Sequence, residues 1–229
     1  MAMKRKLRLF LANVAAVAAL TSCASARFYS GFTPAAAGEM VLLGPVSTQF
    51  YIDANDKEFY SDSLSMASEE LLSDVTVRLG MPVKEIFPLD SLQMEETVGF
   101  MRYLDAASEQ KVGEAPIPSA LDELLEAEGY RYGLLMYAEG MTRDRSRYVK
   151  DAVGSTLLSV FIAVATLGLI VPYAIPVAHT SAIYAAVLDS ETNRVVFFNC
   201  SGPREVSPLE ENHVRSQLAD IFRDFIYRR

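Results

Sequence analysis

One stretch decides the fold: Tyr132-Gly133-Leu134-Leu135-Met136-Tyr137-Ala138. It carries no charge, and it lacks the alternation of apolar and polar residues that marks a strand with one face in water. A strand that is apolar on both faces belongs in the middle of a sheet that other elements cover. The sequence therefore predicts a central β-strand over 132–138, with the rest of the domain built around it.

A second apolar run follows later in the chain and pairs with a third. Residues 182–188 are apolar throughout, the polar stretch 189–194 has the composition of a turn, and 195–198 reads Val-Val-Phe-Phe. This pattern predicts a β-hairpin. Two shorter strands are expected upstream, at 40–43, where Gly44-Pro45 ends the run, and at 83–87.

Helical periodicity fills the spaces between these strands. Apolar residues recur three and four positions apart over 62–79, 90–107, 119–129 and 207–225. The last pattern opens on Ser207-Pro208-Leu209-Glu210, which predicts a capping box with proline at the first helical position. Helices alternate with strands early, and strands pair late. The predicted class is α/β, with α+β as the alternative: a mixed sheet under one layer of helices, a late hairpin and an amphipathic C-terminal helix.

A long apolar insertion interrupts this pattern at residues 152–178. No Asp, Glu, Lys or Arg occurs between Ala152 and Leu188, and 153–171 is nearly long enough for a membrane crossing at about 1.5 Å per residue. Three interpretations stay open: a helix inserted in the membrane, an element buried in the core, and a self-association element with small residues at a helix contact.

The N-terminus has the three parts of an export signal. Lys4, Arg5, Lys6 and Arg8 are basic, and the uncharged stretch 9–20 is too short to span a bilayer. It ends at Leu20-Thr21-Ser22-Cys23. This order resembles the lipobox of bacterial (Gram-negative) lipoproteins. The resemblance implies that the signal is cut before Cys23 and that Cys23 is the lipidation site, carrying palmitate-type acyl chains.

The resemblance also divides the chain. Residues 1–22 are the expected lipoprotein signal peptide, 23–38 the lipidated cysteine and a tether, and 39–229 a single globular domain that contains the insertion 152–178. Several acyl chains on one residue make a stable anchor, whereas one chain binds only marginally. Ala24-Ser25 after the cysteine, with no aspartate, resembles the class sent to the outer membrane. We expect a domain that faces the periplasm, with surface exposure as the alternative.

Charge argues against a nucleic-acid partner. The 229 residues carry a net charge of −8, and the first 22 residues hold four of the 21 basic residues and none of the 29 acidic ones. The mature chain is therefore more acidic still, and phosphate backbones and anionic lipids would repel it. Neither nucleotide-binding glycine motif occurs in the sequence, and two distant histidines with one further cysteine do not make a zinc set, so no cofactor or metal is expected.

No stretch predicts a catalytic site. His179 and Ser181 lie close in sequence at the end of the insertion, but no strand-Ser-helix elbow surrounds them. His213 is expected on a solvated helix face. Cys200 is expected to be a buried residue after a strand and a spare thiol once Cys23 is lipidated.

The order of elements resembles periplasmic accessory lipoproteins of the penicillin-binding-protein-activator and curli-secretion-channel type. This resemblance is one of architecture and carries no residue over beyond the lipobox. It implies a non-catalytic scaffold or accessory subunit of a cell-envelope complex. The membrane is contacted through Cys23 and, in one interpretation, through 152–178, and the other partners are envelope proteins or further copies of the chain. Two alternatives remain: an envelope hydrolase with its site near His179, and a small-ligand carrier.

Overall fold

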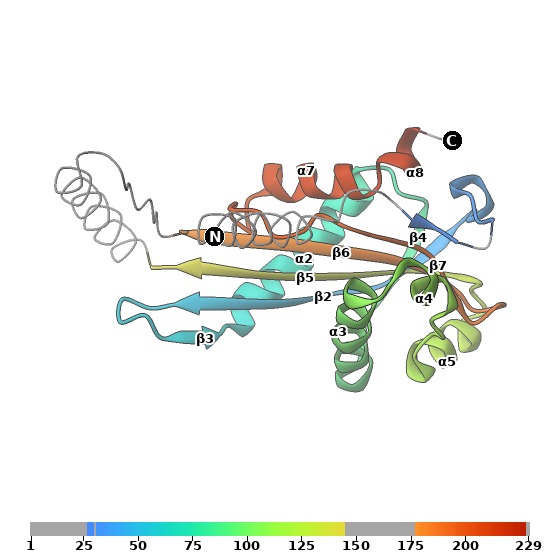
Figure 1. Cartoon of the computed structure of the whole chain (residues 1–229), viewed down its shortest axis with the longest axis horizontal. Helices are drawn as coiled ribbons and strands as arrows, with labels where there is room; N and C mark the ends of the chain where they lie inside the picture. Colours follow the sequence, from blue (N-terminus) through green and yellow to red (C-terminus); the bar gives the residue numbers. More distant parts are fainter. Residues whose placement is uncertain (1–26, 30, 145–176, 228–229) are drawn as a thin grey trace, which may run out of the picture.

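A computed structural model describes residues 27–29, 31–144 and 177–227. They form one mixed seven-stranded sheet in the order β1-β7-β6-β5-β2-β3, with β4 paired to the first part of the same β2 edge whose last part pairs with β3 (Figure 1). The strands are β1 (Arg27–Phe28), β2 (Met40–Ile52), β3 (Glu58–Tyr60), β4 (Val83–Phe87), β5 (Tyr132–Arg143), β6 (His179–Asp189) and β7 (Arg194–Cys200).

Helices cover both faces of this sheet, which corrects the prediction of a single layer. The helices are η1 (Pro34–Ala36), α2 (Asp62–Arg78), α3 (Ser91–Ala106), α4 (Glu109–Glu114), α5 (Ser119–Ala127), α7 (Glu211–Ile221) and α8 (Arg223–Tyr227). One apolar core joins a face of the sheet to α2, α7 and α8, and the other core joins the opposite face to α3, α4 and α5 (Figure 1). The α/β class with a mixed sheet is confirmed.

The central strand lies where its apolar sequence predicts. β5 pairs in parallel with β2 and antiparallel with β6, so both of its edges are bonded. Successive side chains alternate between the two cores: Leu134 and Met136 enter one, while Leu135 and Tyr137 enter the other. The late hairpin is also confirmed, as β6 and β7 pair antiparallel.

β2 does not end at Gly44-Pro45, contrary to the sequence prediction. It continues to Ile52, and its register with β5 shifts between Leu43 and Val46. The shift inserts one extra residue into β2, which is a β-bulge. Proline is tolerated there because its missing N–H falls at an irregularity of the ladder. The bulge also returns Val46 to the same core as Leu43.

The N-terminal half of α2 is held to the sheet by polar groups rather than by an apolar stripe. Ser61 caps the helix, accepting a hydrogen bond from the Leu64 N–H at 3.4 Å. The buried residues of this half are Ser65 and Ser68, and apolar burial begins only at Leu72. The helix is where its periodicity predicts, but the face that it buries is partly polar.

The predicted capping box at 207–210 is wrong. α7 begins at Glu211, its N-cap is Glu210, and no side chain caps it. The Ser207 hydroxyl instead accepts a hydrogen bond from the Leu209 N–H at 3.4 Å, which makes a local turn before the helix. The helix also ends earlier than predicted, at Ile221, and α8 follows as a separate short helix.

Part of the predicted tether is folded. Arg27 and Phe28 pair with β7 as the edge strand β1, and Phe32 is buried. The rings of Phe28 and Phe32 contact Phe225 of α8, at centroid distances of 5.8 and 6.1 Å. Two aromatic side chains thus fix a segment whose small residues and prolines suggest a linker. Cys23, the signal and residues 24–26 lie outside the described residues, so the division of the chain stays a prediction.

The apolar insertion also lies outside the described residues, except for Val177 and Ala178. Its place in the topology is defined by the strands on either side of it. β5 ends at Arg143, β6 begins at His179, and Thr142 lies opposite His179 in the ladder. The chain therefore leaves and re-enters the sheet at the same end of two neighbouring strands.

Candidate functional site

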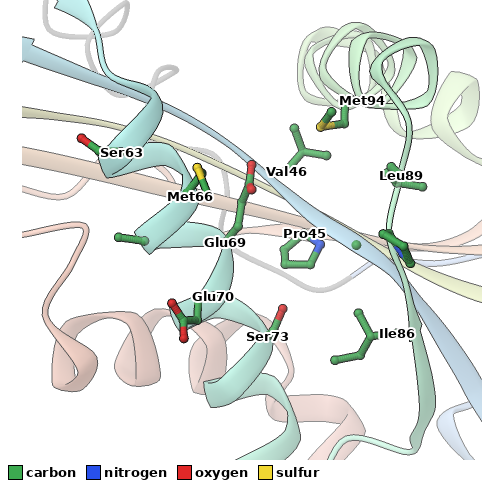
Figure 2. A pocket seen from close by; sticks show the side chains of 13 residues that line it. Pro45, Val46, Ser63, Met66, Glu69, Glu70, Ser73, Ile86, Leu89 and Met94 are labelled. Atoms are coloured by element: carbon green, nitrogen blue, oxygen red, sulfur yellow. The ribbon is translucent and has the colours of Figure 1, made fainter.

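A groove of about 930 Å³ lies where β2 is left unpaired between β3 and β4. Pairing with β4 ends at Leu43, and pairing with β3 begins at Phe50. The floor of the groove is the bulge of β2, one wall is α2, and the other wall is the end of β4 with the segment leading into α3 (Figure 2). We call this cavity the β2 groove; it is lined by Gly44, Pro45, Val46, Ser63, Met66, Ala67, Glu69, Glu70, Ser73, Ile86, Pro88, Leu89 and Met94.

Each wall carries a large apolar side chain that is open to solvent. Met66 is 67% exposed and Ile86 is 42% exposed. Large apolar residues exposed on facing walls of one depression are costly in water, and such places are characteristic of binding surfaces. Figure 2 shows Met66 on the α2 side, and Leu89 and Met94 across from it. The groove is therefore a candidate contact surface.

Glu69 gives the groove its charge. Its carboxylate accepts a hydrogen bond from the Ser47 N–H at 3.0 Å. Burial raises the pKa of Glu69 above its ordinary value, and this one hydrogen bond only partly offsets the effect. Among the described residues no Lys, Arg or His lies within ion-pair distance of Glu69 or of its neighbour Glu70. The groove thus holds an acid without a cation to neutralise it.

Side chains of α2 and the backbone of its N-cap residue close the unpaired edge of β2. Besides the Glu69 contact, the Gln49 N–H donates to the Ser65 hydroxyl at 3.0 Å, and the Gln49 carbonyl accepts from the Ser61 N–H at 2.9 Å. Pro45 has no N–H to offer. The edge therefore does not present the row of unpaired N–H groups that an added strand needs.

His179 and Ser181, the residues of the hydrolase alternative, are each in contact with other groups. The Ser181 hydroxyl is buried and donates to Gln217 Oε1 at 3.0 Å. His179 Nδ1 lies 3.4 Å from the Thr142 hydroxyl. His213 lies at the start of α7, with Nδ1 3.4 Å from Glu210 Oε2. The Ser181 hydroxyl is thus used by a contact within the fold, and His213 is on a different element from His179.

Cys200 is buried as predicted, at 5% exposure. The spare thiol is predicted for a chain lipidated at Cys23 and stays a prediction. The structure has Cys200 disulfide-bonded. The sequence contains one other cysteine, Cys23, which lies outside the described residues.

A second polar cluster lies on the opposite face of the sheet, beside α3. The Tyr137 and Tyr184 hydroxyls donate to the two carboxylate oxygens of Glu139, at 3.2 and 3.3 Å. Arg102 Nη2 lies 3.6 Å from the same carboxylate. Burial raises the pKa of both tyrosines, so both stay protonated donors. With its oxygens already bound, this carboxylate joins α3 to the sheet and is not poised for a ligand.

No group of three or more His, Cys, Asp or Glu residues in the described part of the chain is arranged to hold a metal ion. None of the helices over 27–29, 31–144 and 177–227 combines the length and hydropathy that a membrane crossing needs.

The chain is similar to known proteins in structure only. No family model matches the chain, and no curated protein matches it. Among solved structures, the PelC dodecamer from Paraburkholderia phytofirmans is similar at 9% identity and a TM-score of 0.42, over 90% of this chain and 97% of that one. The LpoB C-terminal domain from Salmonella enterica is similar at 10% identity and a TM-score of 0.29, over 77% and 87%. At these values no residue role transfers.

The sequence reasoning missed the β2 groove. Its lining comes from β2, α2, β4 and the start of α3, which are spread over 51 positions from Gly44 to Met94. One local signal was present: Gly44-Pro45 within an apolar run, which indicates either the end of a strand or a bulge. A bulge at this position implies a longer β2, part of whose edge has no partner strand.

Proposed function

We propose that this chain is a lipid-anchored envelope lipoprotein that acts as a non-catalytic scaffold or accessory subunit and binds a partner protein through the β2 groove. The observation that carries the proposal is the groove itself, whose two walls carry the solvent-exposed apolar side chains Met66 and Ile86 beside an unpaired stretch of β2. A partner that covers these side chains removes their apolar surface from water, which favours binding.

Photo-crosslinking in cells tests this contact. A benzophenone amino acid replaces Met66 in the groove, and in a second strain it replaces Val77, which is also on α2 and 53% exposed but does not line the groove. We expect a discrete higher-mass adduct with another envelope protein from position 66 and none from position 77. Equal labelling at both positions, or no adduct at position 66, would contradict a partner in the groove.

The lipid anchor is a separate part of the proposal, and it rests on the signal-like N-terminus and the lipobox ending at Cys23. The anchor and the disulfide at Cys200 exclude each other within one chain. An intrachain disulfide would need the sulfur of Cys23, and a sulfur in a thioether to lipid cannot form one. Lipidation therefore predicts a mature chain without that bond.

Intact mass measurement of the protein from membranes distinguishes the two states. A mature chain that begins at Cys23 and carries the mass of diacylglyceryl and an N-acyl group supports the anchor. A chain without lipid, whose mass rises by two hydrogens on reduction, would rule the anchor out. The insertion 152–178 is proposed as a further contact with membrane or partner on hydropathy alone, and an alkaline wash of Cys23→Ala membranes tests it.

A further inference from the structure

We infer that the β2 groove takes a short apolar segment of its partner that carries one basic side chain, and that Glu69 binds that side chain. This inference rests on the proposed function, since it names the chemistry of the partner at the same groove. It follows from the shape of the groove, from its charge and from the way in which the edge of β2 is closed.

The apolar part of the occupant follows from the walls. Met66 and Ala67 of α2 stand on one side, and Ile86, Leu89 and Met94 stand on the other. Thioether side chains are flexible and polarisable, so Met66 and Met94 can fit to side chains of differing shape. Leucine-like groups between these walls would cover surface that is exposed in the isolated chain.

The basic side chain follows from Glu69. Its carboxylate is half-buried among apolar groups, receives one backbone N–H and has Glu70 as its neighbour. A carboxylate that a partner desolvates further must gain a cation or lose its charge. An acidic occupant would be repelled, and a purely apolar one would leave the charge buried and unpaired. A lysine or arginine satisfies it.

The mode of binding follows from the closed edge. The N–H groups of Ser47 and Gln49 already donate to α2 side chains, and the Gln49 carbonyl already accepts from the Ser61 N–H. An occupant therefore binds through its side chains, and not as an added strand of the sheet. Its recognition should depend on the Glu69 charge more than on backbone pairing.

A matched set of peptides tests the inference on the full-length chain. The probes are three capped peptides, Gly-Ser-Leu-Leu-Xaa-Leu-Leu-Ser-Gly, in which the central residue is Lys, Gln or Glu. The readout is the set of methionine ¹³C-methyl resonances: Met66 and Met94 report on the groove, and the buried Met101 and Met136 serve as internal controls. We expect the Lys peptide to shift only the groove pair, and to bind about tenfold more tightly than the Gln peptide.

The substitution Glu69→Gln assigns the effect to one carboxylate. It keeps an acceptor for the Ser47 N–H, so the fold is retained, and we expect the Lys peptide to lose its advantage over the Gln peptide. Glu128→Gln, an exposed site that does not line the groove, should leave that advantage intact. Equal binding of the Lys and Glu peptides, or an advantage for Lys that persists in Glu69→Gln, would overturn the inference.

The peptide experiment and the crosslinking experiment can fail independently, so they distinguish this inference from the proposed function. If an adduct forms at position 66 in cells but the peptides show no preference for Lys, the groove binds a partner of different chemistry and this inference fails alone. If the peptides behave as expected and no adduct forms in cells, the proposed cellular role fails.

Discussion

Gly140 of β5 is a position where neighbouring groups leave no room for a side chain. A Cβ at this position would lie 2.5 Å from Gln49 Oε1, 2.7 Å from the Thr180 carbonyl oxygen and 3.1 Å from Pro208 Cβ. Two of these neighbours cannot withdraw easily, because the carbonyl belongs to β6 and Gln49 is held by hydrogen bonds to Ser47 and Ser68. The glycine is needed for space and not for a positive φ.

Gly140→Ala should therefore destabilise the domain by about 1–3 kcal/mol, the usual cost of an overpacked interior. Gly99→Ala is the matched control. Gly99 is exposed in the middle of α3 with nothing within 4 Å of its Cβ position, so alanine there should stabilise by about 0.5–1 kcal/mol. Urea denaturation of the three proteins checks both signs, and a neutral Gly140→Ala would show that the packing around Gln49 is loose.

The raised pKa of Glu69 predicts how the stability of the fold depends on pH. Its pKa in the folded state is raised by burial above the ordinary 4.5. The folded state thus binds the proton more tightly than the unfolded chain does. The stabilisation from protonation is complete below the unfolded pKa and is lost as the pH rises through the folded pKa. At neutral pH the charged carboxylate is a cost that Glu69→Gln removes.

We expect Glu69→Gln to be more stable than the parent chain at pH 7, with a difference that shrinks as the pH falls toward the ordinary carboxyl range. Urea denaturation across a pH series measures it. Glu69→Ala separates charge from hydrogen bonding, because it loses the acceptor for the Ser47 N–H and should be the least stable of the three near neutrality. A constant difference between the Gln variant and the parent would show that burial does not perturb this group.

At the scale of elements, α2 depends on hydrogen bonds where most amphipathic helices depend on apolar burial. Ser65 is buried and accepts the Gln49 N–H. Ser65→Ala leaves that donor without a partner, and we expect a loss of about 1–3 kcal/mol. Ser73→Ala, on the same helix but only partly buried, should change stability by less than about 0.5 kcal/mol. Similar effects at both serines would contradict a polar attachment of α2.

What the sequence could predict at this scale follows from periodicity. The runs in β5, β6 and β7 and the 3.6-residue patterns of α3 and α5 correspond to observed elements, because each signal is local and its burial is mainly apolar. α2 was predicted at the right place, although only its C-terminal half buries apolar residues. Three other features could not be predicted from the sequence, each for a physical reason. The bulge at Pro45 resembles the end of a strand, Ser207 makes a turn where a cap was expected, and the polar face of α2 has no apolar period to detect.

At the scale of the molecule, β1 and the β2 groove lie at opposite edges of the sheet. The order β1-β7-β6-β5-β2-β3 separates the outermost strands by five intervals, or roughly 24 Å at about 4.8 Å each. Cys23 precedes Arg27 of β1 by four residues, which span at most about 14 Å. A lipidated Cys23 would therefore hold the β1 edge near the bilayer and keep the groove away from it, open to a partner in the aqueous space.

Site-specific fluorescence on the lipidated protein in vesicles tests this orientation. A dye attached through a non-natural amino acid replaces the exposed Thr33, close to β1, or Met66 in the groove, and the vesicles contain lipids with a quencher on the headgroup. We expect strong quenching at position 33 and weak quenching at position 66, because only the β1 edge is within reach of the anchor. Equal quenching at both positions would mean that the domain lies flat, with the groove against the membrane. The groove would then contact lipid, and a partner there would have to compete with the bilayer for Met66 and Ile86.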